Sequence, residues 1–510
     1  MRTRSLFYIL AALEGFIALS YEIICTRLIA TYFGINLTGW AAILGTAMSG
    51  LALGYYTGGI LSKKEKFYNA LWVILYLLSC FLGFLPMISF QTLEYFFSYG
   101  IGLFLSSFIL VFPICFILGN IGPLTIQLLA TDYEKSGKLS GLFFTLSSLG
   151  GIIGCFSMAF FLLEIMEINQ ILLSFSLLIN FIITLYLILS GMPKYLLAGI
   201  FTGLIALGGY NAGKNLSYLK DRTILHNSNG IMGQLIVEDK LEKFRKNRIM
   251  YSDRLPQSWI NPFTKISYYN YVHKISALSS VYPENSNALV MGIGGGSSII
   301  EYLRLGFRVD AVELDKNIIQ VANEFFGLKE FSVNMINDDA RHYINTCNKK
   351  YNVILLDIIT GESVPSYLFT MESFEKMVSL LEEDGTLFIH FFGAVSGDKS
   401  EGLLSLIATL KKINSNFALF VEPSIADGMK IFRLSKKKNM EDQDVKRMNV
   451  CCRKYLHQFL KADTTRMGYS QLLTDDKPIM DIYYQKMRSG LNGRFYTWKT
   501  GKVEQQKTNP

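Results

Sequence analysis

Apolar residues are distributed unevenly along the 510-residue chain and divide it into two parts. Residues 1–210 carry long apolar runs with few charges, whereas residues 220–510 have the mixed composition of a soluble domain. Most of the runs approach the roughly 20 residues that a helix needs to cross a bilayer. The predicted spans are 6–28, 41–62, 69–88, 101–122, 141–163, 170–190 and 195–210. We therefore expect an all-α transmembrane domain over residues 1–212.

Basic residues at the ends of these runs predict their orientation. Lysine and arginine precede the first run and occupy the second-to-third and fourth-to-fifth connections, which places the N-terminus in the cytoplasm. A nucleotide-binding domain on the same side requires an even number of spans. We expect residues 195–210, which contain four glycines, to form a half-span or an interfacial element, with a hidden span near Pro113 and Pro123 as the alternative. The predicted count is six to eight spans in the inner membrane, with a cytoplasmic C-terminal domain.

Two of the runs contain glycine at four-residue spacing. Gly50, Gly54 and Gly58 form one stripe, and Gly150 and Gly154 form the other. Small residues at this spacing let helices pack closely in lipid. Packing within one bundle is the favoured interpretation, and a homodimer is the alternative.

The first run also contains charged residues. Glu14 and Glu22 lie inside it, and Arg27 lies near its end. Carboxylates in lipid are costly and count by default as functional candidates. An internal Glu22–Arg27 pair, or interfacial placement, explains them equally well, so both interpretations stay open.

The pattern after residue 220 is that of an α/β domain. The apolar run Ala288–Met291 leads into the glycine cluster Gly292–Gly296, then a helix-like segment and a second apolar run that ends at Glu313. Strand, glycine turn, helix and acidic strand end make the nucleotide-binding half of a Rossmann-like sheet. Later segments predict helices at Lys316–Phe326, Met371–Leu381 and 402–413, and strands at Phe331–Ile336, Tyr351–Leu356, Gly385–Phe391, Phe417–Val421 and Met429–Leu434.

These elements predict a Rossmann-like domain over residues 283–490, with a seven-stranded methyltransferase-type sheet closed by a reversed hairpin. A small β-rich segment over residues 213–282 precedes it. Alternating apolar residues predict an antiparallel element within 221–240 and a hairpin at 248–257, followed by a helix that ends near Val281. Residues 491–510 form a basic polar tail.

Three carboxylates are predicted to meet at one edge of this sheet, because ligands of such sheets bind beyond the carboxyl ends of the strands. Glu313 is suited to a bidentate grip on two ribose hydroxyls. Asp339 can accept from the amine of adenine, while the amide of Ala340 donates to a ring nitrogen. Asp357 follows an apolar strand and can act as a general base. Helix capping is the alternative for each carboxylate.

Composition narrows the choice of partners. The net charge of +8 is modest, and the basic segments suit an anionic membrane face better than nucleic acid. The seven cysteines form neither a disulfide framework nor a metal-ligand spacing, so we expect a reduced, cytosolic soluble part without a metal. The partner that composition indicates is a lipid bilayer.

Several motifs of the soluble part resemble those of the spermidine synthases, which are polyamine aminopropyltransferases. The resemblance covers about residues 230–392. It rests on GQLIVED, VMGIGGGSS, VELD, DDAR and LLDIITGESVPSYLFT, which begin at residues 233, 290, 312, 338 and 355. The apolar part is similar to the membrane module fused to such domains in bacteria, through YEIICTR, GLALGYYTGG and the C-terminal LLTDDKP.

The resemblance implies roles for individual residues. Its implied contacts with decarboxylated S-adenosylmethionine are Gln234, Gly294, Gly295, Gly296, Glu313, Asp339, Ala340 and Pro365, the last one place later than the family's proline. Asp357 would take a proton from the attacking amine, and Tyr271 or His273 would line the acceptor pocket. The implied reaction transfers an aminopropyl group to an amine such as putrescine and releases methylthioadenosine.

The chain departs from the family at the amine. Ser297 and Thr360 stand where the family has aspartates that engage the amine and the aminopropyl group. Each lost charge-assisted hydrogen bond is worth about 1.5–3 kcal/mol, so a dication would bind about a hundred- to ten-thousandfold more weakly. Two alternatives follow: an S-adenosylmethionine-dependent methyltransferase, and a transporter or sensor that binds a nucleoside or polyamine without turnover.

Overall fold

The computed structural model describes most of the chain. The described residues are 2–33, 37–63, 67–85, 99–129, 133–189, 196–215, 222–230, 233–242, 245–252, 255–358, 364–395, 397–414, 416–422, 427–436, 460–464 and 470–483. They form two compact units, Met1–Lys220 and Asp221–Pro510. The predicted basic tail at 491–510 and the adjacent Cys451 and Cys452 lie outside the described residues.

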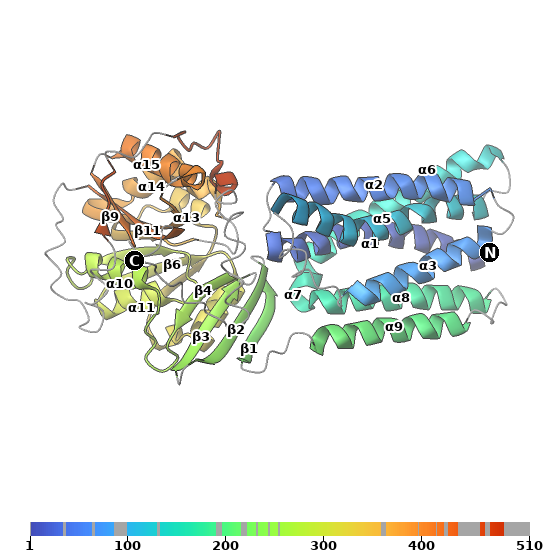
Figure 1. Cartoon of the computed structure of the whole chain (residues 1–510), viewed down its shortest axis with the longest axis horizontal. Coiled ribbons are helices and arrows are strands. Elements are labelled where there is room, and N and C mark those ends of the chain that lie inside the picture. The colour runs from blue at the N-terminus through green and yellow to red at the C-terminus, as the bar shows by residue number, and fades with distance from the viewer. Residues whose placement is uncertain are drawn as a thin grey trace, which may run out of the picture. The chain divides into compact units, whose positions relative to one another are not determined.

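The first unit is a bundle of helices (Figure 1). Its elements are α1 (Arg2–Phe33), α2 (Leu37–Leu61), α3 (Phe67–Phe84), α5 (Tyr99–Leu129), α6 (Tyr133–Ser157), the π-helix η2 (Met158–Leu162), α7 (Leu163–Ile165), α8 (Ile168–Leu189) and α9 (Leu196–Asn215). α1 packs against α6 and α2 against α5, while α3, α8 and α9 pack together. Serine, tyrosine and asparagine side chains link the helices, as in the bond from the Tyr21 hydroxyl to the carbonyl of Leu110 (2.9 Å).

The glycine stripes lie at two of these helix contacts. A Cβ atom on Gly54 would come within 2.4 Å of the Phe116 carbonyl oxygen on α5. One on Gly150 would come within 1.8 Å of the Ala12 carbonyl oxygen on α1. Only glycine permits such a close approach of two backbones, so the prediction of packing within one bundle is confirmed.

One prediction about the helices needs correction: α5 runs without interruption through Pro113 and Pro123, so it hides no further span. Residues 195–210 lie largely in α9, a 20-residue helix about 30 Å long at 1.5 Å per residue, and its placement as a half-span or interfacial element stays a prediction. Its glycines fit the helix because Gly209 packs against the carbonyl of Gly83 and Gly203 lies near Asn180, so small residues serve contacts with α3 and α8.

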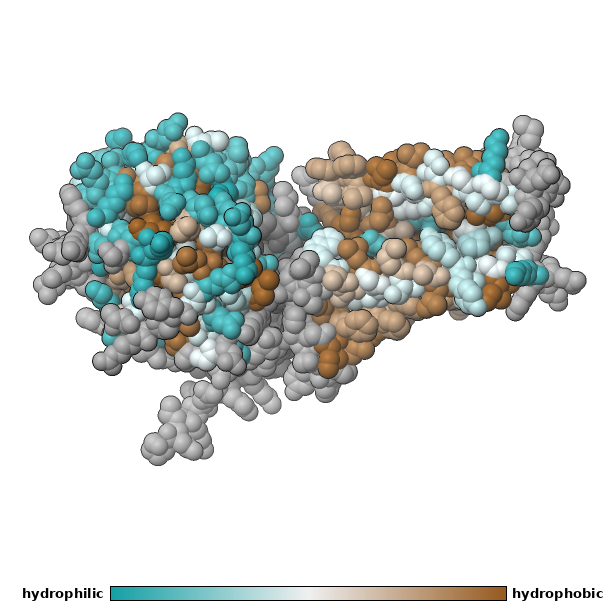
Figure 2. Space-filling view, turned by 90° about the horizontal axis from the view of Figure 1, so that it is seen from above, coloured by the Kyte–Doolittle hydropathy of each residue, from teal (hydrophilic) through white to brown (hydrophobic). Residues whose placement is uncertain are grey.

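Four helical segments of the described part are long and apolar enough to cross a membrane. They are Phe7–Ile29, Ile101–Leu129, Ser136–Leu162 and Ile168–Leu185. The face of this unit that Figure 2 shows is largely hydrophobic, and the exposed side chains of the unit include Phe161, Phe201 and Leu197. The six-to-eight count and the even parity stay predictions.

The second unit contains two sheets. The four-stranded antiparallel sheet has the order β1 (Arg222–Gly230), β2 (Gly233–Glu242), β3 (Arg245–Ser252) and β4 (Leu255–Ile260). The larger sheet has the order β12-β10-β11-β9-β8-β5-β6-β7. Its strands are β5 (Asn287–Met291), β6 (Arg308–Glu313), β7 (Asn334–Asn337), β8 (Tyr351–Leu356), β9 (Leu381–Ala394), β10 (Phe417–Val421), β11 (Asp427–Ser435) and β12 (Leu460–Lys461).

The larger sheet has one strand more than predicted. β5 to β9 pair in parallel, and β10 and β11 form the reversed hairpin that the sequence indicated. The eighth strand, β12, pairs through two residues with β10 at the edge. A two-residue strand carries no alternation of apolar and polar residues, so its sequence offers no signal.

Helices cover both faces of this sheet (Figure 1). They are α10 (Asn270–Ser279), α11 (Ser297–Arg304), α12 (Lys316–Phe325), α13 (Ala340–Thr346), α14 (Met371–Ser379) and α15 (Glu401–Ile413), with short 3₁₀ turns at η4 (Leu328–Glu330), η5 (Ser366–Leu368) and η6 (Asp398–Ser400). Alternate residues of β5 belong to different cores: Ala288 and Val290 pack with α10 to α12, Leu289 and Met291 with α13 to α15. Burial on both faces explains the continuous apolar strands.

Candidate functional site

The carboxyl ends of four neighbouring strands form the candidate site. Gly292 follows β5, Glu313 ends β6, Asp339 follows β7 and Asp357 follows β8. These strands are parallel and adjacent, so their ends meet at one edge of the sheet. The predicted convergence of the three carboxylates on the glycine turn is therefore present in the structure.

The glycine turn is shaped by the protein around it. Gly292 has a φ of 87°, and a Cβ there would lie 2.3 Å from the carbonyl oxygen of Asp357. At Gly295 a Cβ would lie 2.7 Å from the ring of Phe326, and its N–H donates to the Ser258 hydroxyl (2.7 Å). Close packing of the turn against its own domain thus requires glycine, in addition to the predicted approach of a ligand.

Glu313 is tied to the turn through backbone amides. Ile293 donates to Oε2 and Asp315 to Oε1, each at 3.1 Å. Burial raises the pKa of Glu313 above its usual value, while these two amides act in the opposite direction. Each carboxylate oxygen has two acceptor positions, so one on each remains for a ribose hydroxyl. The residue fits the bidentate grip that the sequence predicts.

Asp339 caps a helix, as the alternative interpretation proposed, and also makes a second contact. Its Oδ1 accepts from the amides of Arg341 (2.8 Å) and His342 (3.0 Å) at the start of α13. Its Oδ2 accepts from the Tyr367 hydroxyl (2.8 Å). Ala340 is buried in the first turn of the same helix. The capping interpretation is therefore present in the structure, and Oδ2 is the oxygen that the cap leaves free of backbone amides.

Asp357 is held by two aromatic residues. Tyr271 of α10 donates to Oδ2 (3.0 Å), and Nδ1 of His390 on β9 lies 2.7 Å from Oδ1. The two rings stack on each other with centroids 3.7 Å apart and planes within 4°. Burial and the nearby carboxylate raise the pKa of Tyr271 well above its usual value, so its phenol stays protonated and donates.

Two serines follow the glycine turn near this group. The Ser298 hydroxyl lies 3.4 Å from Oδ2 of Asp357. The Ser297 hydroxyl is buried, and it has no hydrogen-bond partner in the described part of the chain. Ser297 is the position where the resemblance implies a carboxylate, and the structure has a buried hydroxyl there without a partner among the described residues.

The remaining predicted residues are less closely connected to this group. His273 is fully buried, with Nε2 2.8 Å from the Ser267 carbonyl, so Tyr271 is the member of the pair that reaches Asp357. Gln234 lies beside the β1–β2 turn and donates to Asn227 (3.0 Å). Pro365 begins η5. Thr360 lies outside the described residues.

Sequence reasoning missed His390, Ser258 and Tyr367. His390 had a signal: it is the one polar side chain between Leu387 and Phe392, near the carboxyl end of a predicted strand. Such a position on the site's edge favours function over packing. Ser258 and Tyr367 lie in segments without a comparable pattern. Only the folded chain brings Ser258 to the glycine turn and Tyr367 to Asp339.

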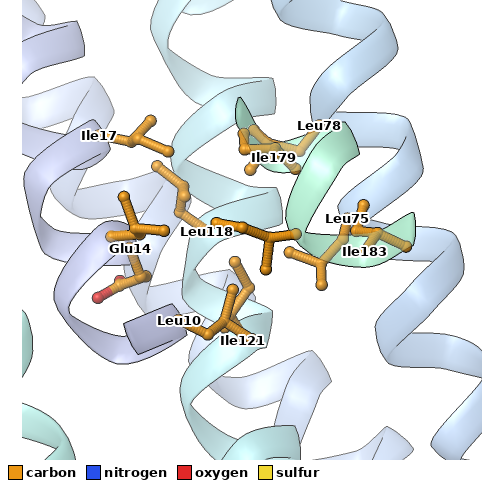
Figure 3. A pocket seen from close by; sticks show the side chains of 11 residues that line it. Leu10, Glu14, Ile17, Leu75, Leu78, Leu118, Ile121, Ile179 and Ile183 are labelled. Carbon is orange, nitrogen blue, oxygen red and sulfur yellow. The ribbon is translucent and has the colours of Figure 1, made fainter. Parts of the chain in front are cut away.

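The helical unit contains a separate pocket. It lies among α1, α3, α5 and α8, and its lining is aliphatic except for Glu14 (Figure 3). Glu14 is 4% exposed and accepts from the Ser147 hydroxyl on α6 (2.5 Å). The cost of burying this carboxylate is thus partly offset by a bond between helices.

Comparison with known proteins agrees with the α/β class of the second unit. Residues 267–446 match the spermine/spermidine synthase domain family. The chain is 32% identical over 138 residues to the polyamine aminopropyltransferase of Vibrio vulnificus, covering 26% of this chain and 46% of the relative. It is 31% identical over 137 residues to the N-terminal histidine N-methyltransferase of Emericella nidulans, covering 26% and 23%. The chain thus spans less than half the length of these two curated relatives.

A probable spermidine synthase from Corynebacterium glutamicum aligns over 49% of this chain and 96% of its own, with a TM-score of 0.41 and 16% identity. The match to the spermine/spermidine synthase domain and the two curated relatives thus concern a part of the C-terminal unit, and they show what this part of the chain is similar to.

Proposed function

We propose that the C-terminal unit is an aminopropyltransferase that uses decarboxylated S-adenosylmethionine and an amine acceptor. The observation that carries this proposal is the convergence of the glycine turn, Glu313, Asp339 and Asp357 on one sheet edge. The co-substrate supplies an electrophilic methylene beside a sulfonium. Glu313 keeps one acceptor position on each carboxylate oxygen, and these positions suit the ribose hydroxyls of the co-substrate. The residues present therefore fit the co-substrate.

Asp357 is proposed as the general base. The amine nitrogen forms a bond to the methylene carbon, the carbon–sulfur bond breaks with its electron pair on sulfur, and the nitrogen loses a proton to Asp357. Tyr271 and His390 hold the two carboxylate oxygens and so fix the direction from which a proton is taken. Held in this way, Asp357 needs no reorganisation to accept the proton.

The acceptor amine is the least defined component. Putrescine is the family's implied acceptor, and Ser297 and Thr360 remove two carboxylates that would bind its charges. We propose a neutral or singly charged contact through Ser297, whose hydroxyl has no described partner. An amine with one cationic group would suit this end of the site better than a diamine.

The assay follows from this chemistry. Purified full-length protein is incubated with labelled decarboxylated S-adenosylmethionine and a panel of mono- and diamines, and products are identified by mass. Methylthioadenosine and an aminopropylated amine are expected, and Asp357→Asn serves as the matched inactive control. Absence of methylthioadenosine with every amine, at ample protein concentration, would overturn the proposal.

Methyl transfer is the second candidate, supported by the similarity to the Emericella nidulans histidine N-methyltransferase. Serine at position 297 also leaves room for the carboxylate of intact S-adenosylmethionine, because it adds no negative charge beside it. The same assay with S-adenosylmethionine separates the two: S-adenosylhomocysteine as the product would favour the methyltransferase. Calorimetric affinities for the two sulfonium nucleosides give an independent comparison.

We further infer that the helical unit is embedded in a bilayer, with the C-terminal unit in the cytoplasm. Four sufficiently long apolar helical segments and the hydrophobic surface of this unit support the inference (Figure 2). The test is a cysteine introduced at exposed Glu330 in a background without native cysteines. An impermeant maleimide should label it only after the cells are lysed, and labelling of intact cells would overturn the orientation.

A further inference from the structure

The segment 470–483, which contains the motif LLTDDKP, is attached to the second unit through apolar side chains. Leu473 and Met480 are fully buried in the core that α13 to α15 share. The Leu473 amide donates to the Thr409 hydroxyl of α15 (3.0 Å), and its carbonyl accepts from the Met371 amide at the start of α14 (2.8 Å). These contacts hold the segment in place, so its aspartates are available for another role.

Asp475 of this segment connects elements beside the candidate site. Its Oδ2 accepts from Arg341 on α13 (2.5 Å), and its Oδ1 accepts from the hydroxyl of Thr370, the N-cap residue of α14 (2.6 Å). Arg341 also donates to the Thr370 hydroxyl (3.2 Å) and to the carbonyl of Tyr367 in η5 (3.0 Å). An aspartate and an arginine that lie 134 positions apart in the chain thus join α13, η5 and α14.

A second aspartate holds the other end of η5. The Ser366 hydroxyl donates to Oδ1 of Asp481 (2.6 Å) and accepts from the Asp481 amide (2.7 Å). Ser366 is the first residue of η5, and Pro365 is its N-cap residue. The segment 470–483 therefore binds the chain on both sides of η5, at Ser366 and at Thr370.

The elements held in this way carry the predicted adenine contacts. Asp339 and Ala340 lie at the start of α13, and Pro365 lies at the start of η5. The two elements touch each other, since the Tyr367 hydroxyl donates to Oδ2 of Asp339 (2.8 Å). Oδ2 keeps one acceptor position, which suits the exocyclic amine of adenine. Whether that position faces an adenine depends on how α13 and η5 are held together.

The ion pair of Asp475 with Arg341 contributes little to the stability of the fold. The side chain of Asp475 is 44% exposed and that of Arg341 is 19% exposed, and ion pairs in contact with water add little to folding. Their alignment is the more important property. Groups that contact a ligand must be held by a supporting layer of residues, because a small displacement weakens binding.

We propose that Asp475 and Asp481 are positioning residues of the nucleoside site, which hold α13 and η5 at the separation that an adenine needs. This inference rests on the proposed nucleoside function. Asp475 acts through Arg341 and Asp481 acts through Ser366, so neither needs to touch the nucleoside. The segment 470–483 then completes a site whose contacts lie more than 100 positions earlier in the chain.

The experiment compares two nucleosides on the full-length protein in detergent. Calorimetry measures binding of 5′-methylthioadenosine and 5′-methylthioinosine, and a thermal melt measures stability. Asp475→Asn keeps an oxygen for the Thr370 hydroxyl and removes the charge that binds Arg341. Its affinity for the adenine nucleoside should fall about three- to tenfold, because one hydrogen bond to the base loses its alignment. The inosine affinity should fall less, since hypoxanthine has no amine to donate to Asp339, and the melting temperature should stay unchanged.

The neighbouring aspartate supplies the matched control. Asp476 is exposed and makes no hydrogen bond or ion pair among the described residues. Asp476→Asn removes the same charge one position away and should change neither affinity. A difference between the two variants therefore reports the contacts of Asp475 and not the net charge of the segment.

Two further variants test the route. Arg341→Gln removes the guanidinium that Asp475 holds, so the double variant with Asp475→Asn should lose no more affinity than Arg341→Gln by itself. Ser366→Ala removes both bonds to Asp481 and should lower the adenine affinity by a similar factor.

Two results would overturn the inference and leave the proposed function intact. One is an adenine affinity of Asp475→Asn and Ser366→Ala equal to that of the wild type. The other is a loss of affinity that is the same for both nucleosides, which a merely structural role would produce. Failure of the wild type to bind either nucleoside would overturn the proposed function instead.

Discussion

The two ends of the candidate site are built differently. The nucleoside end, Gly292–Gly296 with Glu313 and Asp339, is fixed by backbone amides and by the packing of the turn. The amine end, Ser297, Asp357, Tyr271 and His390, is fixed by side chains, with one carboxylate between two aromatic rings. Backbone contacts tolerate sequence change better than side-chain contacts. In the proposed site, a single substitution such as that at Ser297 therefore changes the contacts of the amine end more than those of the nucleoside end.

The largest expected effect lies at the amine end. Asp357→Asn keeps the size of the side chain and removes the proton acceptor. Turnover should fall about a hundred- to ten-thousandfold, the usual contribution of a positioned general base. Nucleoside affinity, measured by calorimetry, should change little. A comparable loss of nucleoside affinity would show that the two ends are not separable.

The next largest effect lies at the nucleoside end. Glu313→Gln removes the charge that accepts ribose hydroxyls and should weaken methylthioadenosine binding about a hundredfold. Because burial raises the pKa of Glu313 above 4.5, the wild type should lose affinity on acidification at a higher pH than an exposed glutamate would allow. Protonation removes an acceptor, so affinity falls as the pH falls. A wild type and a variant with the same pH dependence would contradict this.

A smaller effect is expected from the two residues that hold Asp357. Tyr271→Phe removes the hydroxyl and keeps the ring, and His390→Phe removes Nδ1 and keeps the stack on Tyr271. Each should lower kcat about tenfold, as expected for one hydrogen bond to a charged group, with the nucleoside Kd unchanged. Steady-state kinetics and calorimetry on the same preparations measure both. Loss of nucleoside affinity without loss of kcat would show that these residues support nucleoside binding and not the position of Asp357.

The smallest expected effect is a lower KM for putrescine. Ser297→Asp restores a carboxylate beside the amine and should lower KM for putrescine several-fold, since one charge-assisted hydrogen bond is added at the start of α11. Ser297→Asn has the size and shape of the aspartate variant without its charge, and it should leave KM for putrescine unchanged. Equal values for both variants would mean that charge at this position does not select the amine.

Much of the α/β unit was predictable. The strand at Tyr351–Leu356 and the helix that begins at Lys316 match the structure because apolar runs and glycine turns report burial directly. β7 was predicted to begin at Phe331 and instead begins at Asn334, since Phe331 is the C-cap residue of η4 and the chain leaves that turn before it enters the sheet. The glycines of α9 serve contacts with neighbouring helices, which the sequence alone did not indicate.

The sequence by itself determined the two-part organisation, the strand ends that carry Glu313, Asp339 and Asp357, and the departure at Ser297. Each of these depends on local pattern, which the chain carries residue by residue. Only the tertiary structure decided that His390 stacks on Tyr271 and that the Tyr367 hydroxyl donates to Asp339. These contacts join residues from distant segments, and their partners are set by how the helices and strands pack.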